Sequence, residues 1–479
     1  MAPWALAALL LATPALALRR ARPEGPGREL DELLARRGTV SMREVKAAAG
    51  KALGPVVEQV RKRSVAMSRE GGRERFWNPC HMAKAGGCPL SNLPRGVSTA
   101  VFPGGRTRCI FGDEFAFHVR PGARDRLLLA FEGGGACWDE VTTTVQPACL
   151  PQVHPTEMLG PFNPCPGENP FAGHTVIFVS ACSGDLHAGN VKRPWPNAAA
   201  PEKGVEQHGY DNTRSAVEWA KANLDSRLAS FALVGESAGA IAVQLWAHTL
   251  LREFSYESAS VLADAYAGIF PAGFQGPIFK EMGTCGLFSP ELAAKCESGQ
   301  ISIPEVYDAA MKEFPDVRFA NLNSKHDFGQ ILFYNLATTT TRLKKIAEFC
   351  GGYDVDACDT ANAPPELLEI TEPMNGEAYH SQLEPILAQH SKSANYGFYE
   401  MSGGAHGLSP VLFGECPGVD YAAVGFVGGA AGAQRLGVRS WMTNLVQPSG
   451  PVQRICEKLD SLDTDDSCSP ALEAVAAQR

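Results

Sequence analysis

The sequence predicts an α/β fold with a mostly parallel sheet, helices on both faces and long disulfide-stapled loops. Two observations favour it: short apolar runs alternate with helical stretches, and each run is continuously apolar, as in strands buried on both faces. The intervening segments are rich in Gly, Pro and Cys. The apolar fraction of 45% and the charged fraction of 20% are typical of a soluble globular protein.

The elements follow one another in an alternating order. Strands are expected over residues 126–131, 175–179, 231–234, 260–264, 317–320 and 396–399, and helices over 211–223 and 238–253. A helix between successive strands returns the chain to the same edge of the sheet, so the strands run parallel.

Composition divides the chain into four segments. Residues 1–18 are almost wholly apolar, end in small residues and precede Arg19-Arg20, which is typical of a signal peptide. Residues 19–75 are charged and Ala-rich and predict a helical or flexible segment. Residues 76–456 predict the main α/β domain, and residues 457–479 an acidic C-terminal tail.

Cysteine content and charge restrict the compartment and the partners. Fourteen cysteines behind a signal peptide indicate disulfides and a secreted or secretory-lumen protein. The chain has no Cys-x-x-Cys pair, which disfavours zinc. A net charge of -9 argues against nucleic acid, and no later segment predicts stable membrane insertion. Local pairing is plausible for Cys80 with Cys88, Cys137 with Cys149, Cys285 with Cys296, Cys350 with Cys358, and Cys456 with Cys468.

Residues 235–239 read Gly-Glu-Ser-Ala-Gly and fit the G-x-S-x-G pattern. An apolar strand enters this pattern and an Ala-rich helix leaves it, which is the setting of a nucleophile elbow. Small neighbours are needed because the serine backbone is strained there. We therefore expect Ser237 to be a nucleophile on an α/β-hydrolase-like sheet, rather than a serine that only caps a helix.

An oxyanion hole should be built from backbone N–H groups near an earlier strand end and after the serine. Residues 132–138, Glu-Gly-Gly-Gly-Ala-Cys-Trp, follow the strand 126–131. A phosphate-binding loop is disfavoured because the Gly-Lys-Ser/Thr ending is absent. We expect Gly134, Gly135 and Ala238 to form the hole.

The base and its acid are expected downstream of the serine. His406 follows the strand 396–399 in a glycine-rich loop, which suits a base that must reach Ser237. His380 and His390 are interpreted as surface residues of a polar helix. Asp327 and Asp264 each follow a predicted strand, and the residues alone leave both open as the acid.

Taken together, these segments resemble the pectin acetylesterase family, which includes the Notum-like carboxylesterases. The matches extend from about residue 76 to 445, and their common order is more specific than any single motif. The microbial branch is the more similar one near the oxyanion hole. The matching segments are residues 131–138, 169–171, 182–189, 208–212 and 235–239, with a distal Asp and His.

The resemblance implies a Ser237–His406–Asp327 triad, which resolves the choice between the two aspartates, and no metal or organic cofactor. It also implies a secreted serine carboxylesterase that removes O-acetyl groups from a polysaccharide such as pectin, so the expected partner is an acylated carbohydrate or another ester. The chain departs from the family pattern at Glu236, where Cys or Thr is common.

Two other functions remain open. One is a lipase-like or polyester-cleaving hydrolase, which would need an apolar acyl pocket. The other is a catalytically silent secreted binding protein on the same scaffold. Asp185 and His187 also match the family pattern and are interpreted as structural or pocket-lining residues.

Overall fold

The computed structural model describes residues 39–54, 78–155, 169–368, 372–407, 432–447, 452–457 and 468, with short gaps at 46, 49, 52–53, 85, 146, 198–199, 354 and 356. The chain forms two compact units. The larger comprises Val56–Ala337 and Met374–Arg479, and the smaller comprises Met1–Pro55 and Thr338–Pro373. The predicted signal peptide and nearly all of the predicted acidic tail lie outside the described residues.

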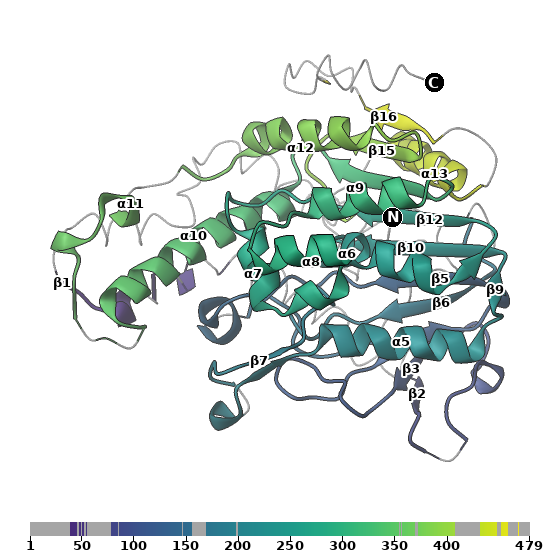
Figure 1. Ribbon diagram of the computed structural model, residues 1–479, viewed down its shortest axis with the longest axis horizontal. Helices are drawn as coiled ribbons and strands as arrows, with labels where there is room; N and C mark the ends of the chain where they lie inside the picture. Colours follow the sequence, from purple (N-terminus) through teal and green to yellow (C-terminus); the bar gives the residue numbers. More distant parts are fainter. Residues whose placement is uncertain are drawn as a thin grey trace, which may run out of the picture. The chain divides into compact units, whose positions relative to one another are not determined.

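A ten-stranded sheet forms the centre of the larger unit (Figure 1). Its strand order is β16-β15-β13-β12-β10-β5-β6-β4-β3-β2, and every neighbouring pair from β16 to β6 is parallel. Only β4 runs antiparallel to its neighbours, so the mostly parallel sheet is confirmed. The bounds are β2 (Asn78–His81), β3 (Thr99–Phe102), β4 (Phe117–Arg120), β5 (Ala123–Phe131), β6 (His174–Val179), β10 (Ser230–Glu236), β12 (Ala259–Asp264), β13 (Arg318–Ser324), β15 (Tyr396–Met401) and β16 (Arg454–Cys456).

Helices cover both faces of this sheet. Leu128 and Ala130 of β5 belong to a core cluster that includes Trp441 of α13, and the alternating residues Leu127 and Leu129 point to the other face. In Figure 1 the helices α5, α6 and α9 lie in front of the strands. The helices of the larger unit are α5 (Gly209–Asn223), α6 (Ala238–Glu253), α7 (Gln275–Glu281), α8 (Pro290–Glu297), α9 (Ile303–Glu313), α12 (Gly376–His390) and α13 (Gly432–Val446).

Observed and predicted elements agree well around the central strands. The predicted helix 238–253 is α6, and the predicted strands lie within β5, β6, β10, β12 and β15. The strand β13 begins one residue later than predicted and continues four residues further, to Ser324. The strands β2, β3 and β4 were not predicted, because each has four residues and none is a continuous apolar run. Two small two-stranded sheets complete the unit: β7 (Val191–Arg193) with β8 (Val205–Gln207), and β9 (Arg227–Leu228) with β11 (Ser255–Tyr256).

Six disulfides join the described cysteines. The five local pairs suggested by spacing are confirmed. The sixth, Cys109–Cys182, spans 73 residues and could not be inferred from spacing. It ties the segment before β4 to the loop after β6, where the N–H of Ile110 also donates to the carbonyl of Cys182.

The smaller unit combines two distant parts of the sequence. Its strand β1 (Thr39–Val40) pairs antiparallel with β14 (Cys358–Asp359), and α11 (Pro365–Leu368) follows. The helix α10 (Phe328–Cys350) begins in the larger unit and ends in the smaller one. The composition-based division placed these two parts in different segments, because β1 lies within residues 19–75 and β14 within residues 76–456.

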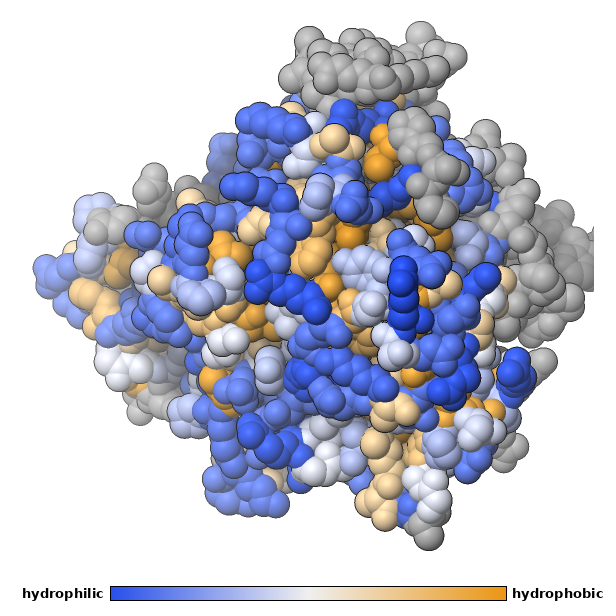
Figure 2. Space-filling view, turned by 45° about the vertical axis from the view of Figure 1, so that its right-hand side comes forward, coloured by the Kyte–Doolittle hydropathy of each residue, from blue (hydrophilic) through white to orange (hydrophobic). Residues whose placement is uncertain are grey.

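Most of the coloured surface in Figure 2 is hydrophilic, and hydrophobic residues are scattered between polar ones. Among the described residues, the exposed large hydrophobic side chains are Met82, Val97 and Phe349. None of the helices in the described part of the chain combines the length and the apolar character that crossing a membrane requires.

Candidate active site

Ser237 occupies the sharp turn between β10 and α6. Its backbone has φ 57° and ψ -121°, a strained conformation for a residue with a side chain. A β-carbon on Gly235 would lie 1.9 Å from the carbonyl oxygen of Gly239, and one on Gly239 would lie 2.1 Å from that of Phe131. Only glycine fits at these two positions, so the small residues of the motif are explained by the packing of the turn.

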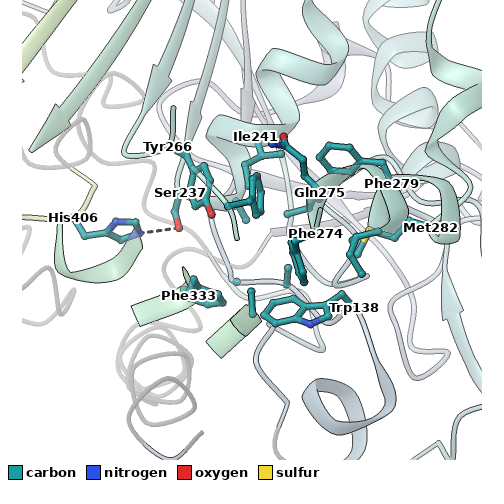
Figure 3. Close-up of a pocket in the computed structure, with 17 residues that line it drawn as sticks. Trp138, Ser237, Ile241, Tyr266, Phe274, Gln275, Phe279, Met282, Phe333 and His406 are labelled. Atoms are coloured by element: carbon teal, nitrogen blue, oxygen red, sulfur yellow. Dashed lines mark hydrogen bonds between the residues drawn. The ribbon is translucent and has the colours of Figure 1, made fainter. Parts of the chain in front are cut away.

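The structure brings Ser237, His406 and Asp327 into one hydrogen-bonded chain. The Nε2 atom of His406 is 2.8 Å from Oγ of Ser237, and its Nδ1 atom is 2.7 Å from Oδ1 of Asp327. Figure 3 shows the imidazole of His406 directed at the serine oxygen. Ser237 is 8% exposed and Asp327 is fully buried, so the acid end of this hydrogen-bonded chain is shielded from bulk water.

Asp327 is held in place by the first turn of α10. Its Oδ1 accepts from the backbone N–H of Gln330 at 2.9 Å, and its Oδ2 accepts from the Gln330 side-chain amide at 3.0 Å. The position immediately before a helix favours an ionised carboxylate, because the free N–H groups and the helix dipole both stabilise negative charge. The two hydrogen bonds from Gln330 therefore fix the carboxylate in orientation.

His406 lies in the loop after β15 and packs against the start of α10. A β-carbon on Gly329 would lie 2.4 Å from Cγ of His406, so glycine at 329 makes room for the ring. Burial acts to lower the pKa of His406. The charge and hydrogen bond of Asp327, with smaller contributions from Glu236 and Asp264, outweigh it and raise the pKa above the ordinary imidazole value.

Asp264, the alternative acid, contacts the backbone of Ser237. It is fully buried at the end of β12, and its main-chain carbonyl accepts from the N–H of Ser237 at 2.8 Å. Both ring nitrogens of His406 are engaged, one by Asp327 and one by Ser237. Asp264 therefore supports the nucleophile turn through its backbone, whereas Asp327 contacts the imidazole.

The glycine loop after β5 lies beside the nucleophile. A β-carbon on Gly135, whose φ is +71°, would lie 2.0 Å from the carbonyl oxygen of Ala148, and one on Gly134 would lie 2.8 Å from Leu150. The Gly134 carbonyl accepts from the N–H of Leu150 at 2.8 Å, which fixes the loop. Within the described part of the chain, the N–H groups of Gly134, Gly135 and Ala238 have no acceptor. These are the three residues expected from the sequence to form the oxyanion hole.

An apolar cavity opens next to Ser237. It encloses about 570 Å³ of empty space, including its open mouth. In Figure 3 the aromatic rings of Phe333, Phe274 and Trp138 lie along one side, and Phe279 and Met282 lie at the end away from His406. Apart from Ser237 and His406, the described lining has polar groups on Gln275, Tyr266 and Trp138. The Oε1 of Gln275 accepts from the N–H of Ile303, and the hydroxyl of Tyr266 donates to the carbonyl of Ile269.

The sequence did not reveal this cavity. Its wall is assembled from the loop after β5, the helix α6, the segment from Tyr266 to Met282 and the first part of α10. The available signal was the run of Phe270, Phe274 and Phe279, in which three aromatic residues lie four and five positions apart in a loop-rich segment. Such spacing is equally typical of an ordinary core helix, so it does not identify a ligand cavity.

Asp185 and His187 hold the loop that follows β6. Asp185 accepts from the Ser183 hydroxyl at 2.6 Å and from the Gly209 N–H at 2.7 Å, and burial raises its pKa. A nitrogen of His187 lies 2.8 Å from the carbonyl oxygen of Glu132, and burial lowers the pKa of His187 to about 4. These contacts join the loop to the start of α5 and to Glu132, at the start of the glycine loop after β5.

His380 and His390 are not surface residues, so that interpretation was wrong. His390 is fully buried and lies 2.6 Å from Asp308, because α12 packs this side against α9. His380 lies 3.0 Å from the buried carboxylate of Glu400 and 3.7 Å from Glu384. Among the described residues, these three side chains could together hold a metal ion, but the hydrogen bond between His380 and Glu400 already accounts for their proximity.

Comparison with known proteins gives matches among solved structures only. No protein-family model matches the chain, and no curated protein matches it. Among solved structures, the chain is similar to the Wnt deacylase Notum from Drosophila, with 16% sequence identity and a TM-score of 0.42, over 64% of this chain and 85% of that one.

Proposed function

We propose that this chain is a secreted serine carboxylesterase. Its proposed substrates are esters whose acyl group is apolar and longer than acetyl. The observation that carries the proposal is the Ser237–His406–Asp327 hydrogen-bonded chain at the mouth of an apolar cavity. A nucleophile, a base and an orienting acid in this order are the parts that acyl transfer requires. The six disulfides support an oxidising compartment.

In the proposed first step, His406 Nε2 takes the proton of Ser237 as Oγ attacks the ester carbonyl. Asp327 keeps the other ring proton on Nδ1, so that Nε2 is available as the base, and it stabilises the imidazolium that forms. The strained turn at Ser237 holds Oγ above the sheet edge, and the 2.8 Å separation from Nε2 is within proton-transfer distance.

The tetrahedral intermediate places negative charge on the former carbonyl oxygen. The N–H groups of Gly134, Gly135 and Ala238 are the proposed donors to that oxygen. Loss of one such donor typically raises the activation free energy by about 3 kcal/mol. The imidazolium of His406 then protonates the leaving alcohol, and in the second half of the reaction it activates the water that hydrolyses the acyl-enzyme.

The lining of the cavity favours one of the two substrate classes that the sequence left open. Apolar and aromatic side chains extend from Ser237 to Phe279 and Met282, which is more apolar wall than an acetyl group would contact. Each buried methylene contributes about 0.8 kcal/mol, or roughly fourfold in the specificity constant. An apolar acyl chain would use this wall, so the lipase-like alternative is favoured over removal of O-acetyl groups from pectin.

Covalent labelling tests the proposal against a catalytically silent binding protein. The secreted wild-type protein and Ser237→Ala are treated with a fluorophosphonate, and the modified peptide is identified by mass spectrometry. Labelling of Ser237 in the wild type, with loss of p-nitrophenyl ester hydrolysis in Ser237→Ala, is the expected result. An unlabelled wild type that hydrolyses no ester would support the binding-protein alternative instead.

A further inference from the structure

Glu236 stands directly before the nucleophile, and the mechanism above gives it no role. It is the last residue of β10, and only 4% of it is exposed. A carboxylate is costly to bury unless nearby groups stabilise its charge or its charge is used. Glu236 is one residue from Ser237, so the backbone holds it beside the nucleophile.

Two glycines of the candidate site border this carboxylate. A β-carbon on Gly407 would lie 2.4 Å from Oε1 of Glu236, and one on Gly133 would lie 3.1 Å from Oε2. Gly407 directly follows His406 and has a φ of +72°, and Gly133 begins the oxyanion loop. The side chain of Glu236 therefore packs between the loop that carries the base and the loop that carries the oxyanion donors.

Three carboxylates act on the imidazole of His406. Asp327 is the closest and contributes most to the raised pKa of His406 after the opposing effect of burial, and Glu236 and Asp264 follow in that order. They come from three different strand ends, since β10, β12 and β13 are neighbours in the sheet. Glu236 and Asp264 are also register partners, so their backbones lie side by side.

Three other titratable side chains near these elements are Tyr266, His326 and Lys325. The phenol of Tyr266 lines the cavity, and burial raises its pKa, which keeps it neutral. His326 directs its ring toward His380, with ring centroids 6.1 Å apart. The ammonium of Lys325 donates to the carbonyl of Glu457 at 2.7 Å.

We propose that Glu236 is a positioning residue that supports the Gly407 end of the His406 loop and stabilises the His406 imidazolium while Ser237 is acylated. The inference rests on the proposed ester hydrolysis and deepens it. His406 gains a positive charge when Ser237 attacks, and a fixed negative charge in a buried site favours that state over neutral imidazole.

The test separates the charge of Glu236 from its shape. Glu236→Gln keeps the size of the side chain and removes the charge, whereas Glu236→Asp keeps the charge on a shorter side chain. Glu218→Gln, on the exposed face of α5, is the matched control for loss of one carboxylate. Each protein is checked for thermal unfolding. The pH dependence of two quantities is then measured: kcat/KM for a p-nitrophenyl ester and the rate of Ser237 modification by a fluorophosphonate.

We expect both acid limbs of Glu236→Gln to move to lower pH, because the pKa of His406 falls when a neighbouring negative charge is lost. We also expect kcat to fall roughly tenfold, because the imidazolium is less stable. Glu236→Asp should keep most of the wild-type acid limb, and Glu218→Gln should coincide with the wild type.

A folded Glu236→Gln protein with the wild-type acid limbs and kcat would overturn the inference while leaving the proposed esterase intact. Failure of the proposed function has a different signature, since the wild type itself would then resist the fluorophosphonate and hydrolyse no ester. That second result would overturn both.

Discussion

Asp327 contacts the imidazole of His406 through a 2.7 Å hydrogen bond, although the two residues are 79 positions apart. We expect Asp327→Asn to lower kcat by about 10⁴, because an amide favours the wrong imidazole tautomer and does not stabilise the imidazolium. The measurement is kcat of wild type and Asp327→Asn for hydrolysis of a p-nitrophenyl ester. Asp264→Asn is the matched comparison and should lose far less, because Asp264 meets the nucleophile through its backbone carbonyl. A larger loss in Asp264→Asn would assign the acid to Asp264.

The raised pKa of His406 fixes the direction of the pH profile. The base must be neutral to accept the Ser237 proton, so kcat/KM should be high above the pKa of His406 and fall as the pH drops through it. Because the three carboxylates raise that pKa, the acid limb should lie above the ordinary imidazole value of 6.5. An acid limb below that value would contradict the charge environment described here.

The far end of the cavity should set the acyl chain length. Met282 lies at the end away from His406 (Figure 3), so Met282→Trp should fill that end. We expect kcat/KM for a p-nitrophenyl ester of about ten carbons to fall at least tenfold, and kcat/KM for the acetate to stay unchanged. The acetate serves as the internal control for the catalytic groups. An equal loss on both esters would indicate damage to the site rather than a shortened cavity.

Three buried histidines should make the fold sensitive to acid. Burial lowers the pKa of His118, of His174 and of His187 from 6.5 to about 4. These histidines therefore bind protons more strongly in the unfolded chain than in the folded one. Their contribution to the free energy of unfolding is fully present above pH 6.5 and is lost as the pH falls toward about 4. At pH 5 the free energy of unfolding should be lower by about 2 kcal/mol for each of these histidines. Denaturant unfolding at pH 7.5 and pH 5 measures the loss.

His118→Gln provides the check on that assignment. The variant should be less stable than the wild type at pH 7.5, because the contact between His118 and Ser98 is lost. Its stability should nevertheless depend less steeply on pH between 6.5 and 4. A variant with the same pH slope as the wild type would show that His118 does not contribute to the acid sensitivity.

The central strands and the nucleophile turn could be predicted from sequence because their signals are local. The continuous apolar runs predict β5, β6 and β10, and the Gly-Glu-Ser-Ala-Gly pattern predicts the turn at Ser237. The roles of Ser237, Asp327, His406 and the oxyanion donors stay predictions until variants are measured.

The parts that escaped prediction depend on contacts between distant segments. Both Asp327 and Asp264 follow a strand, so local pattern left both open as the acid, and the choice of Asp327 came from the family resemblance. The cavity wall joins Trp138, Phe274 and Phe333, which no sequence period connects. The smaller unit was missed for the same reason, since β1 and β14 have two residues each and pair across more than 300 positions.

The measurement that tests the central claim most directly is kcat/KM for p-nitrophenyl esters from acetate to palmitate, with wild type and Ser237→Ala. We predict serine-dependent hydrolysis that rises roughly fourfold for each added methylene until the cavity is filled. Hydrolysis strongest on acetate would contradict the apolar acyl cavity and favour a deacetylase. Hydrolysis that persists in Ser237→Ala would contradict the nucleophile itself.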